Sequence, residues 1–152
     1  MKNHDLTAEQ VRDLRALAGT IIPPGPAYGA PGADDELIFN DILGGLERDR
    51  DEICRALAHL AALAGGGFAD LGSERRAEVA ATFREAGGAP LAALVRVVLL
   101  CYYRDDRVMR SLGQEPRPPF PKGHVVEQGD WSLLDAVRAR PRMYRVVDKP
   151  AR

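Results

Sequence analysis

The sequence lacks the motifs that usually identify a catalytic or cofactor-binding protein. Its 152 residues contain no P-loop, no dinucleotide-binding glycine motif, no nucleophile elbow and no zinc-protease helix. Its three histidines stand far from one another and from both cysteines, unlike the closely spaced ligands of a zinc site. We therefore expect no cofactor and no metal in this chain.

Strong charge and long apolar runs are missing as well. The formal net charge is −1, which argues against a nucleic-acid partner. The longest apolar run, residues 91–103, is interrupted by Arg96 and falls short of the roughly 20 residues that a membrane span requires. The first residues contain no apolar signal-peptide region, so as written the chain is expected to be cytoplasmic.

Cysteine is scarce, and its placement leaves two interpretations open. Cys54 and Cys101 lie far apart in apolar surroundings and form no C-x-x-C pair. The first interpretation is two buried free thiols. The second is a single disulfide, which needs an oxidising compartment and Cα atoms within about 7 Å.

Aromatic and β-branched residues are few, whereas alanine, leucine and arginine dominate, which favours helix. The sequence predicts an all-α fold, a single compact helical domain of about five helices. Apolar periodicity, capping residues and glycine or proline stops place the helices at residues 8–22, 35–43, 46–64, 74–86 and 91–103, with a shorter turn at 106–112. The four prolines and three glycines of residues 23–32 predict an ordered or partly ordered loop.

Particular residues receive specific roles in these helices. Thr7 and Gln10 have the spacing of a capping box, and Ser73 is predicted to cap the fourth helix. Leu37 is assigned to the apolar stripe of the second helix together with Ile38 and Ile42. The helix at residues 91–103 is apolar nearly all round, so it is either the central core helix or a helix shared with a partner.

The character of the chain changes after Gly113. We divide it into a helical domain, residues 1–113, and an extended Pro-rich C-terminal arm, residues 114–152, which either belongs to the same domain or wraps around a partner. Asp130 is predicted to cap a short helix in this arm, which Pro141 ends.

The arm supplies the candidate partner-binding residues, because preformed polyproline loses little entropy on binding and large aromatic side chains anchor interfaces. These candidates are Pro118, Pro119, Phe120, Pro121, Lys122, Trp131, Arg138 and Arg142. The arginines of the C-terminal region fit a solvated tail and docking onto an acidic protein surface equally well.

Two features carry an enzymatic interpretation. Asp105 and Asp106 resemble an acid pair, although the neighbouring Arg104 and Arg107 favour an ion-paired helix junction. His59, on the flank of an apolar stripe, is expected to be a partly buried structural residue. A small enzyme with a site assembled around His59, Tyr102 and Asp105 is the catalytic alternative.

Two stretches of the sequence resemble a known family. Residues 20–25, Thr-Ile-Ile-Pro-Pro-Gly, are followed by Pro-Gly-Ala-Asp at 31–34. Residues 102–108, Tyr-Tyr-Arg-Asp-Asp-Arg-Val, are followed by Leu-Gly at 112–113, Pro-Pro-Phe-Pro-Lys-Gly at 118–123 and Asp-Trp-Ser-Leu-Leu at 130–134. In order and spacing they are similar to the small subunit, called subunit 3 or the gamma subunit, of the gluconate 2-dehydrogenase family.

This resemblance implies a non-catalytic accessory subunit. In that family a large flavoprotein of the glucose–methanol–choline class holds FAD and oxidises a sugar or alcohol, and a cytochrome c subunit often takes the electrons. The small subunit binds and stabilises the large one, and many members carry a twin-arginine signal that exports the pair. No such signal precedes Asp5, so the protein is expected in the cytoplasm, or in the periplasm if it is co-exported or has lost a signal. The alternative function is a free-standing helical adaptor or regulatory domain.

Overall fold

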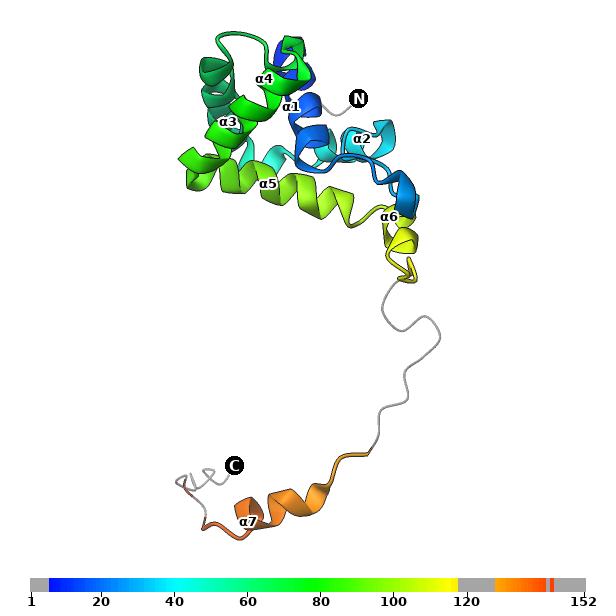
Figure 1. Ribbon diagram of the computed structural model, residues 1–152. Helices are drawn as coiled ribbons and strands as arrows, with labels where there is room; N and C mark the ends of the chain where they lie inside the picture. The colour runs from blue at the N-terminus through cyan, green and yellow to red at the C-terminus, as the bar shows by residue number, and fades with distance from the viewer. Residues whose placement is uncertain (1–5, 118–127, 142, 144–152) are drawn as a thin grey trace, which may run out of the picture. The chain divides into compact units, whose positions relative to one another are not determined.

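Seven α-helices and four short 3-10 helices make up the regular structure of this computed structural model, which describes residues 6–117, 128–141 and 143 (Figure 1). Within these residues there is no β-strand beyond one isolated bridge, so the all-α prediction is confirmed. The helices are α1 (Ala8–Ile21), α2 (Glu36–Gly44), α3 (Arg50–Ala64), α4 (Ser73–Ala86), α5 (Gly88–Tyr102), α6 (Asp106–Ser111) and α7 (Asp135–Arg138).

Caps and stops define the ends of these helices much as the sequence predicts. Thr7 accepts a hydrogen bond from the backbone N–H of Gln10, whose side chain accepts from the N–H of Thr7, so the capping box of α1 is present. Gly65 ends α3 in the left-handed conformation, with φ of 72°. The role given to Ser73 is wrong: Ser73 is the first residue of α4, Gly72 holds the cap position, and no side chain caps that end.

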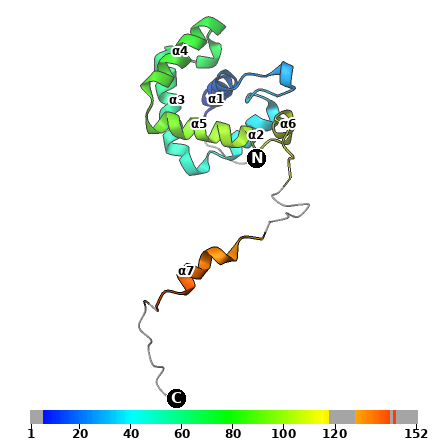
Figure 2. The same ribbon diagram turned by 60° about the horizontal axis from the view of Figure 1, so that its bottom comes forward.

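The chain divides into two units, Met1–Arg117 and Pro118–Arg152. In the first unit α5 packs along α3 and against α2, while α4 and α1 cover α3 from other sides (Figures 1 and 2). Leu94 and Val98 of α5 and Leu60 of α3 are almost completely buried where these helices meet. Burial of such side chains contributes roughly 1.5–3 kcal/mol each, so this contact is a main source of stability.

Helix α5 packs in the core, in agreement with the first of the two interpretations of its composition, whereas the sharing of this helix with a partner stays a prediction. One face is buried in the core, whereas Leu99 and Leu100 on the other face are exposed. Arg96, the one charged residue of the helix, reaches Asp49 in an ion pair. The helix is therefore central to the domain and also presents apolar surface outward.

Two predicted burials are corrected by the structure. Leu37 is 65% exposed, and the neighbouring Phe39 is buried in its place beneath the guanidinium of Arg15, 5.5 Å from the ring centre. His59 is exposed, and its ring packs edge-on against the ring of Phe83. Both residues stand at the margin of an apolar stripe, where the packing of neighbouring helices decides which side chain turns inward.

The second unit is described for residues 128–141 and 143. Its regular structure is a 3-10 helix, Trp131–Leu134, that continues into α7. Asp130 accepts a hydrogen bond from the backbone N–H of Ser132, 3.0 Å away, and so caps this segment as predicted. The polyproline-like residues 118–123 lie outside the described residues.

Candidate functional site

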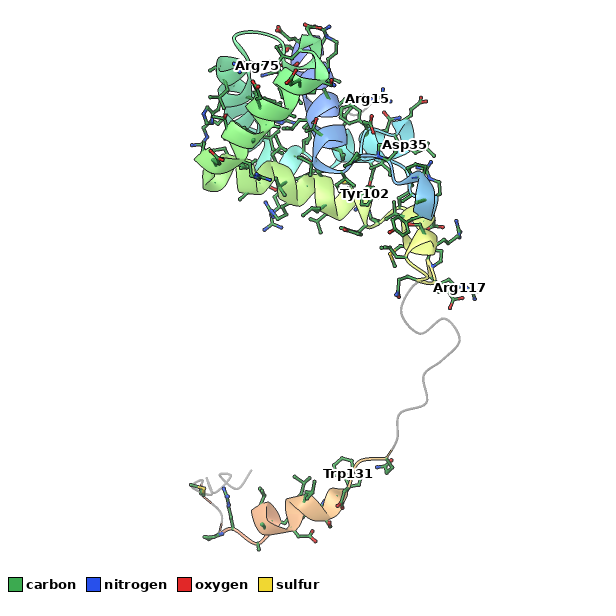
Figure 3. All side chains as sticks on the ribbon, viewed as in Figure 1. Arg15, Asp35, Arg75, Tyr102, Arg117 and Trp131 are labelled. Carbon is green, nitrogen blue, oxygen red and sulfur yellow. The ribbon has the colours of Figure 1, made fainter. Side chains whose placement is uncertain are left out.

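Of the predicted partner-binding residues, Trp131 and Arg138 fall within the part of the chain that the structure describes. The others, residues 118–122 and Arg142, lie outside it. Trp131 is 58% exposed (Figure 3). Arg138 pairs with Asp135 one turn earlier at 3.3 Å, so its charge is partly satisfied on its own helix.

Apolar side chains of the second unit repeat at a three-residue interval. Trp131, Leu134 and Val137 are all exposed, and we call them the C-terminal apolar face. In a 3-10 helix side chains three residues apart project in the same direction, and in an α-helix they lie on nearly the same side. An apolar stripe of this kind is typical of a segment that binds in a groove.

A second cluster lies in the first unit, where α6 begins. The guanidinium of Arg107 contacts both carboxyl oxygens of Asp105, at 3.0 Å each, and both of Asp35, at 2.6 and 3.2 Å. Each carboxylate also caps a helix: Asp35 accepts from the N–H of Leu37, and Asp105 from the N–H of Arg107 itself. One arginine thereby ties the start of α2 to the start of α6.

The electrostatics of this cluster favour the charged forms of Asp35, Asp105 and Arg107. Hydrogen bonds from Arg107 lower the pKa of Asp35 and of Asp105 below the ordinary aspartate value, against the opposing effect of partial burial. The two carboxylates in turn raise the pKa of the Arg107 guanidinium. A carboxylate held in its ionised form by a bidentate arginine is poorly suited to general acid–base catalysis at neutral pH.

Beside this cluster, residue 31 contacts residue 102, which is far away in the sequence. The hydroxyl of Tyr102 donates a hydrogen bond to the carbonyl of Pro31, at 3.1 Å. Arg15 donates to the backbone carbonyl of Asp34 at 2.9 Å, on the same side of the first unit (Figure 3). We call Asp35, Tyr102, Asp105 and Arg107 the junction.

Two glycines allow the connection between α1 and α2 to pack closely against itself and against α1. A Cβ at Gly32 would stand 3.1 Å from the backbone nitrogen of Pro24 and would collide with the carboxylate of Asp34. A Cβ at Gly19 of α1 would come within 2.8 Å of the same carboxylate group. The Thr-Ile-Ile-Pro-Pro-Gly and Pro-Gly-Ala-Asp stretches therefore have a structural role, which is to close a tight connection between α1 and α2.

That connection is a hairpin-like loop, residues 22–33, which we call the Tyr28 loop. Its base is closed by a hydrogen bond from Ala33 N–H to the carbonyl of Ile22, at 2.9 Å, and its middle by a reciprocal pair between Gly25 and Ala30. A 3-10 turn, Pro26–Tyr28, forms the tip. Tyr28 is 78% exposed, the most exposed aromatic side chain among the described residues. The sequence predicted a loop here but not this hydrogen-bonded form.

The residues proposed for an enzymatic site do not form one catalytic group. Tyr102 and Asp105 are neighbours, but their side chains are engaged with Pro31 and Arg107, whereas His59 packs on Phe83 of α4. The described residues hold no cluster of three or more histidine, cysteine or acidic side chains able to bind a metal ion.

Both cysteines are free thiols in the structure, Cys54 half-buried and Cys101 buried. Burial, reinforced by the nearby carboxylate of Asp41, raises the pKa of the Cys101 thiol to about 11. A thiol with so high a pKa is a weak nucleophile at neutral pH. The packing of Cys101 within the core is enough to explain the presence of a cysteine at this position.

An apolar groove of about 440 Å³ lies between α1, α4 and α5. Leu17 and Ile21 of α1 form one wall, Ala80 of α4 another, and Leu91 and Val95 of α5 a third. The hydroxyl of Thr20, also in the lining, donates to the carbonyl of Ala16, so it is already satisfied. The groove is a depression between packed helices with few polar groups to orient a small ligand.

In the described part of the chain no single helix is long and apolar enough to cross a membrane; only the pair α4 and α5, bent by 118°, meets that length and composition together. No protein-family model matches the sequence, and comparisons with curated proteins and with solved structures find no match.

Proposed function

We propose that this chain is a non-catalytic accessory subunit that binds and stabilises an FAD-dependent sugar or alcohol dehydrogenase. The flavin and the chemistry belong to the partner in this proposal, and a cytochrome c subunit is a further candidate member of the complex. The proposal starts from the resemblance of residues 20–34 and 102–134 to the small subunit of gluconate 2-dehydrogenase.

The observation that carries a binding role is the C-terminal apolar face. Trp131, Leu134 and Val137 are all exposed to solvent, although burial of each such side chain contributes roughly 1.5–3 kcal/mol. Tryptophan is also the residue type most enriched at the energetic centres of protein interfaces. In this proposal the partner subunit buries these side chains.

The junction supports the accessory role in a different way. Pro31 of the first stretch and Tyr102, Asp105 and Arg107 of the second lie in or beside this cluster, which holds the Tyr28 loop and the start of α6 in place. The side chains of Tyr102, Asp105 and Arg107 are used in a loop contact, a helix cap and ion pairs. This use fits a subunit that presents surfaces and leaves the reaction to another chain.

The test is co-expression with the product of the neighbouring reading frame, which this proposal expects to be an FAD-binding oxidoreductase, followed by co-purification and a flavin absorbance spectrum. We expect a stoichiometric complex that Trp131→Ala weakens by about 30-fold, equivalent to about 2 kcal/mol. The melting temperature of the isolated small chain should stay the same, because Trp131 is exposed. Leu37→Ala, which removes an exposed apolar side chain from the first unit, is the matched control and should bind normally.

Two results contradict this proposal. If no flavoprotein co-purifies with the wild-type chain, the accessory role is wrong and the adaptor alternative gains support. If the complex forms but Trp131→Ala binds as tightly as the wild type, the C-terminal apolar face is not part of the interface.

A further inference from the structure

We propose that the Tyr28 loop is a second, preorganised anchor, which inserts the ring of Tyr28 into an uncharged apolar pocket on a partner protein. The proposal rests on the proposed function in one respect, since the dehydrogenase subunit is the partner in which we expect that pocket. It concerns a different part of the chain from the C-terminal apolar face.

The chemistry of the loop defines the kind of pocket it fits. Residues 20–33 contain no charged side chain, and the prolines and alanine around the tip are exposed together with Tyr28. Surface loops are normally polar, so a long uncharged stretch that ends in an exposed aromatic ring is unusual for a loop with only a connecting role. The complementary surface is concave, apolar and uncharged, with a polar group within reach of the phenol hydroxyl.

The loop is held in one conformation before any partner arrives. Ala33 and Ile22 close its base, while Gly25 and Ala30 exchange hydrogen bonds of 2.9 and 3.2 Å in its middle. The N–H of Tyr28 donates to the carbonyl of Gly25 at 2.9 Å. Binding through this loop therefore costs little additional backbone entropy, which is the usual advantage of a preorganised binding element.

One glycine shapes the turn that carries the aromatic ring, and a second lies beside it. Gly29, with φ of 63°, takes the left-handed conformation that ends the turn after Tyr28. A Cβ at Gly25 would lie 3.7 Å from the edge of the Tyr28 ring, so the ring passes directly beside the backbone of Gly25. The Tyr28 side chain therefore packs against the backbone of its own loop at the tip.

The junction fixes the loop to the body of the domain. The hydroxyl of Tyr102 holds the carbonyl of Pro31, and Arg107 holds Asp35 immediately after the loop. The 3-10 turn lies on the same side of the first unit as α6 in both ribbon views (Figures 1 and 2). The junction therefore acts as the base of the anchor.

The experiment places the photo-crosslinking amino acid p-benzoylphenylalanine at position 28 of the full chain in its native cells and identifies the crosslinked protein by mass spectrometry. Position 75 on α4, which lies away from Asp35 and the loop before it in Figure 3, is the control for random crosslinking. The identified partner is then purified, and its affinity is measured for the wild type, Tyr28→Ala, Tyr28→Phe and Gly29→Ala.

We expect a crosslink to the flavoprotein at position 28 and none at position 75. Tyr28→Ala should weaken binding at least about tenfold with no change in melting temperature, and Tyr28→Phe should retain most of the affinity. Gly29→Ala should also weaken binding, although it removes no contact atom, because alanine resists the left-handed conformation.

The outcomes separate this inference from the proposed function. A crosslink to a different protein, whose binding Tyr28→Ala weakens tenfold, supports the anchor and shows that the dehydrogenase proposal is wrong. No crosslink above the position 75 control, or equal affinity of Tyr28→Ala and wild type, overturns the anchor even if the flavoprotein co-purifies.

Discussion

Replacing Arg107 by alanine tests whether the junction stabilises the first unit. The substitution removes four side-chain hydrogen bonds, two to each carboxylate, and leaves Asp35 and Asp105 without their cation. The Arg107 side chain is 38% exposed, whereas those of Asp35 and Asp105 are 28% and 16% exposed. The cluster is therefore intermediate between an exposed ion pair, worth about 0.2–1 kcal/mol, and a buried pair, whose disruption costs about 3–5 kcal/mol.

We expect Arg107→Ala to lower the free energy of unfolding by about 2 kcal/mol in a urea titration at pH 7. Arg107→Lys should recover less than half of that loss, because an ammonium group cannot bind two carboxylates in the bidentate manner of a guanidinium. Arg110→Ala, on the same helix, removes an exposed pair with Asp106 and is the matched control, with an expected loss below about 0.5 kcal/mol. If Arg107→Ala costs no more than Arg110→Ala, the junction contributes no stability and the reasoning fails.

Two other predictions concern the core and the pH dependence of folding. Leu94→Ala should lower the free energy of unfolding by about 3 kcal/mol, because the side chain is almost fully buried. Leu100→Ala on the exposed face should cost less than about 0.5 kcal/mol. Similar losses for the two variants in urea titrations would contradict the assigned orientation of α5. Because their pKa values are lowered from 3.8, Asp35 and Asp105 contribute stability that is fully present above that value and is lost as the pH falls through their values in the folded protein. Stability measured between pH 6 and pH 2.5 should therefore fall less in Asp35→Asn than in the wild type, and parallel curves would refute this assignment.

Helix positions were predictable because local chemistry determines them. The prolines that begin at Pro23 end α1, and Gly65 ends α3, through restrictions that act within a few residues. The choice between Leu37 and Phe39 as the buried side chain of α2 was not predictable in this way. It depends on Arg15, a residue of another helix that covers the Phe39 ring.

The junction shows the same division between local and distant information. The run that contains Asp105 and Arg107 correctly predicted an ion-paired helix junction, because two acidic residues stand there between two arginines. The second carboxylate that Arg107 binds, that of Asp35, is separated from Arg107 by 72 positions, and nothing in the sequence around Asp35 identifies Arg107 as its partner. Likewise, the glycines and prolines of the Tyr28 loop predicted a loop, whereas its paired hydrogen bonds depend on the contacts that close its two ends.

The exposure of Trp131, Leu134 and Val137 in the second unit has an evolutionary consequence. A core residue such as Leu94 is under selection for folding, so most substitutions there are removed whatever they do to binding. Trp131 belongs to the second unit and is 58% exposed, so a change at that position leaves the buried core of the first unit as it is. Partner preference can therefore diverge through this segment while the helical domain is inherited almost unchanged.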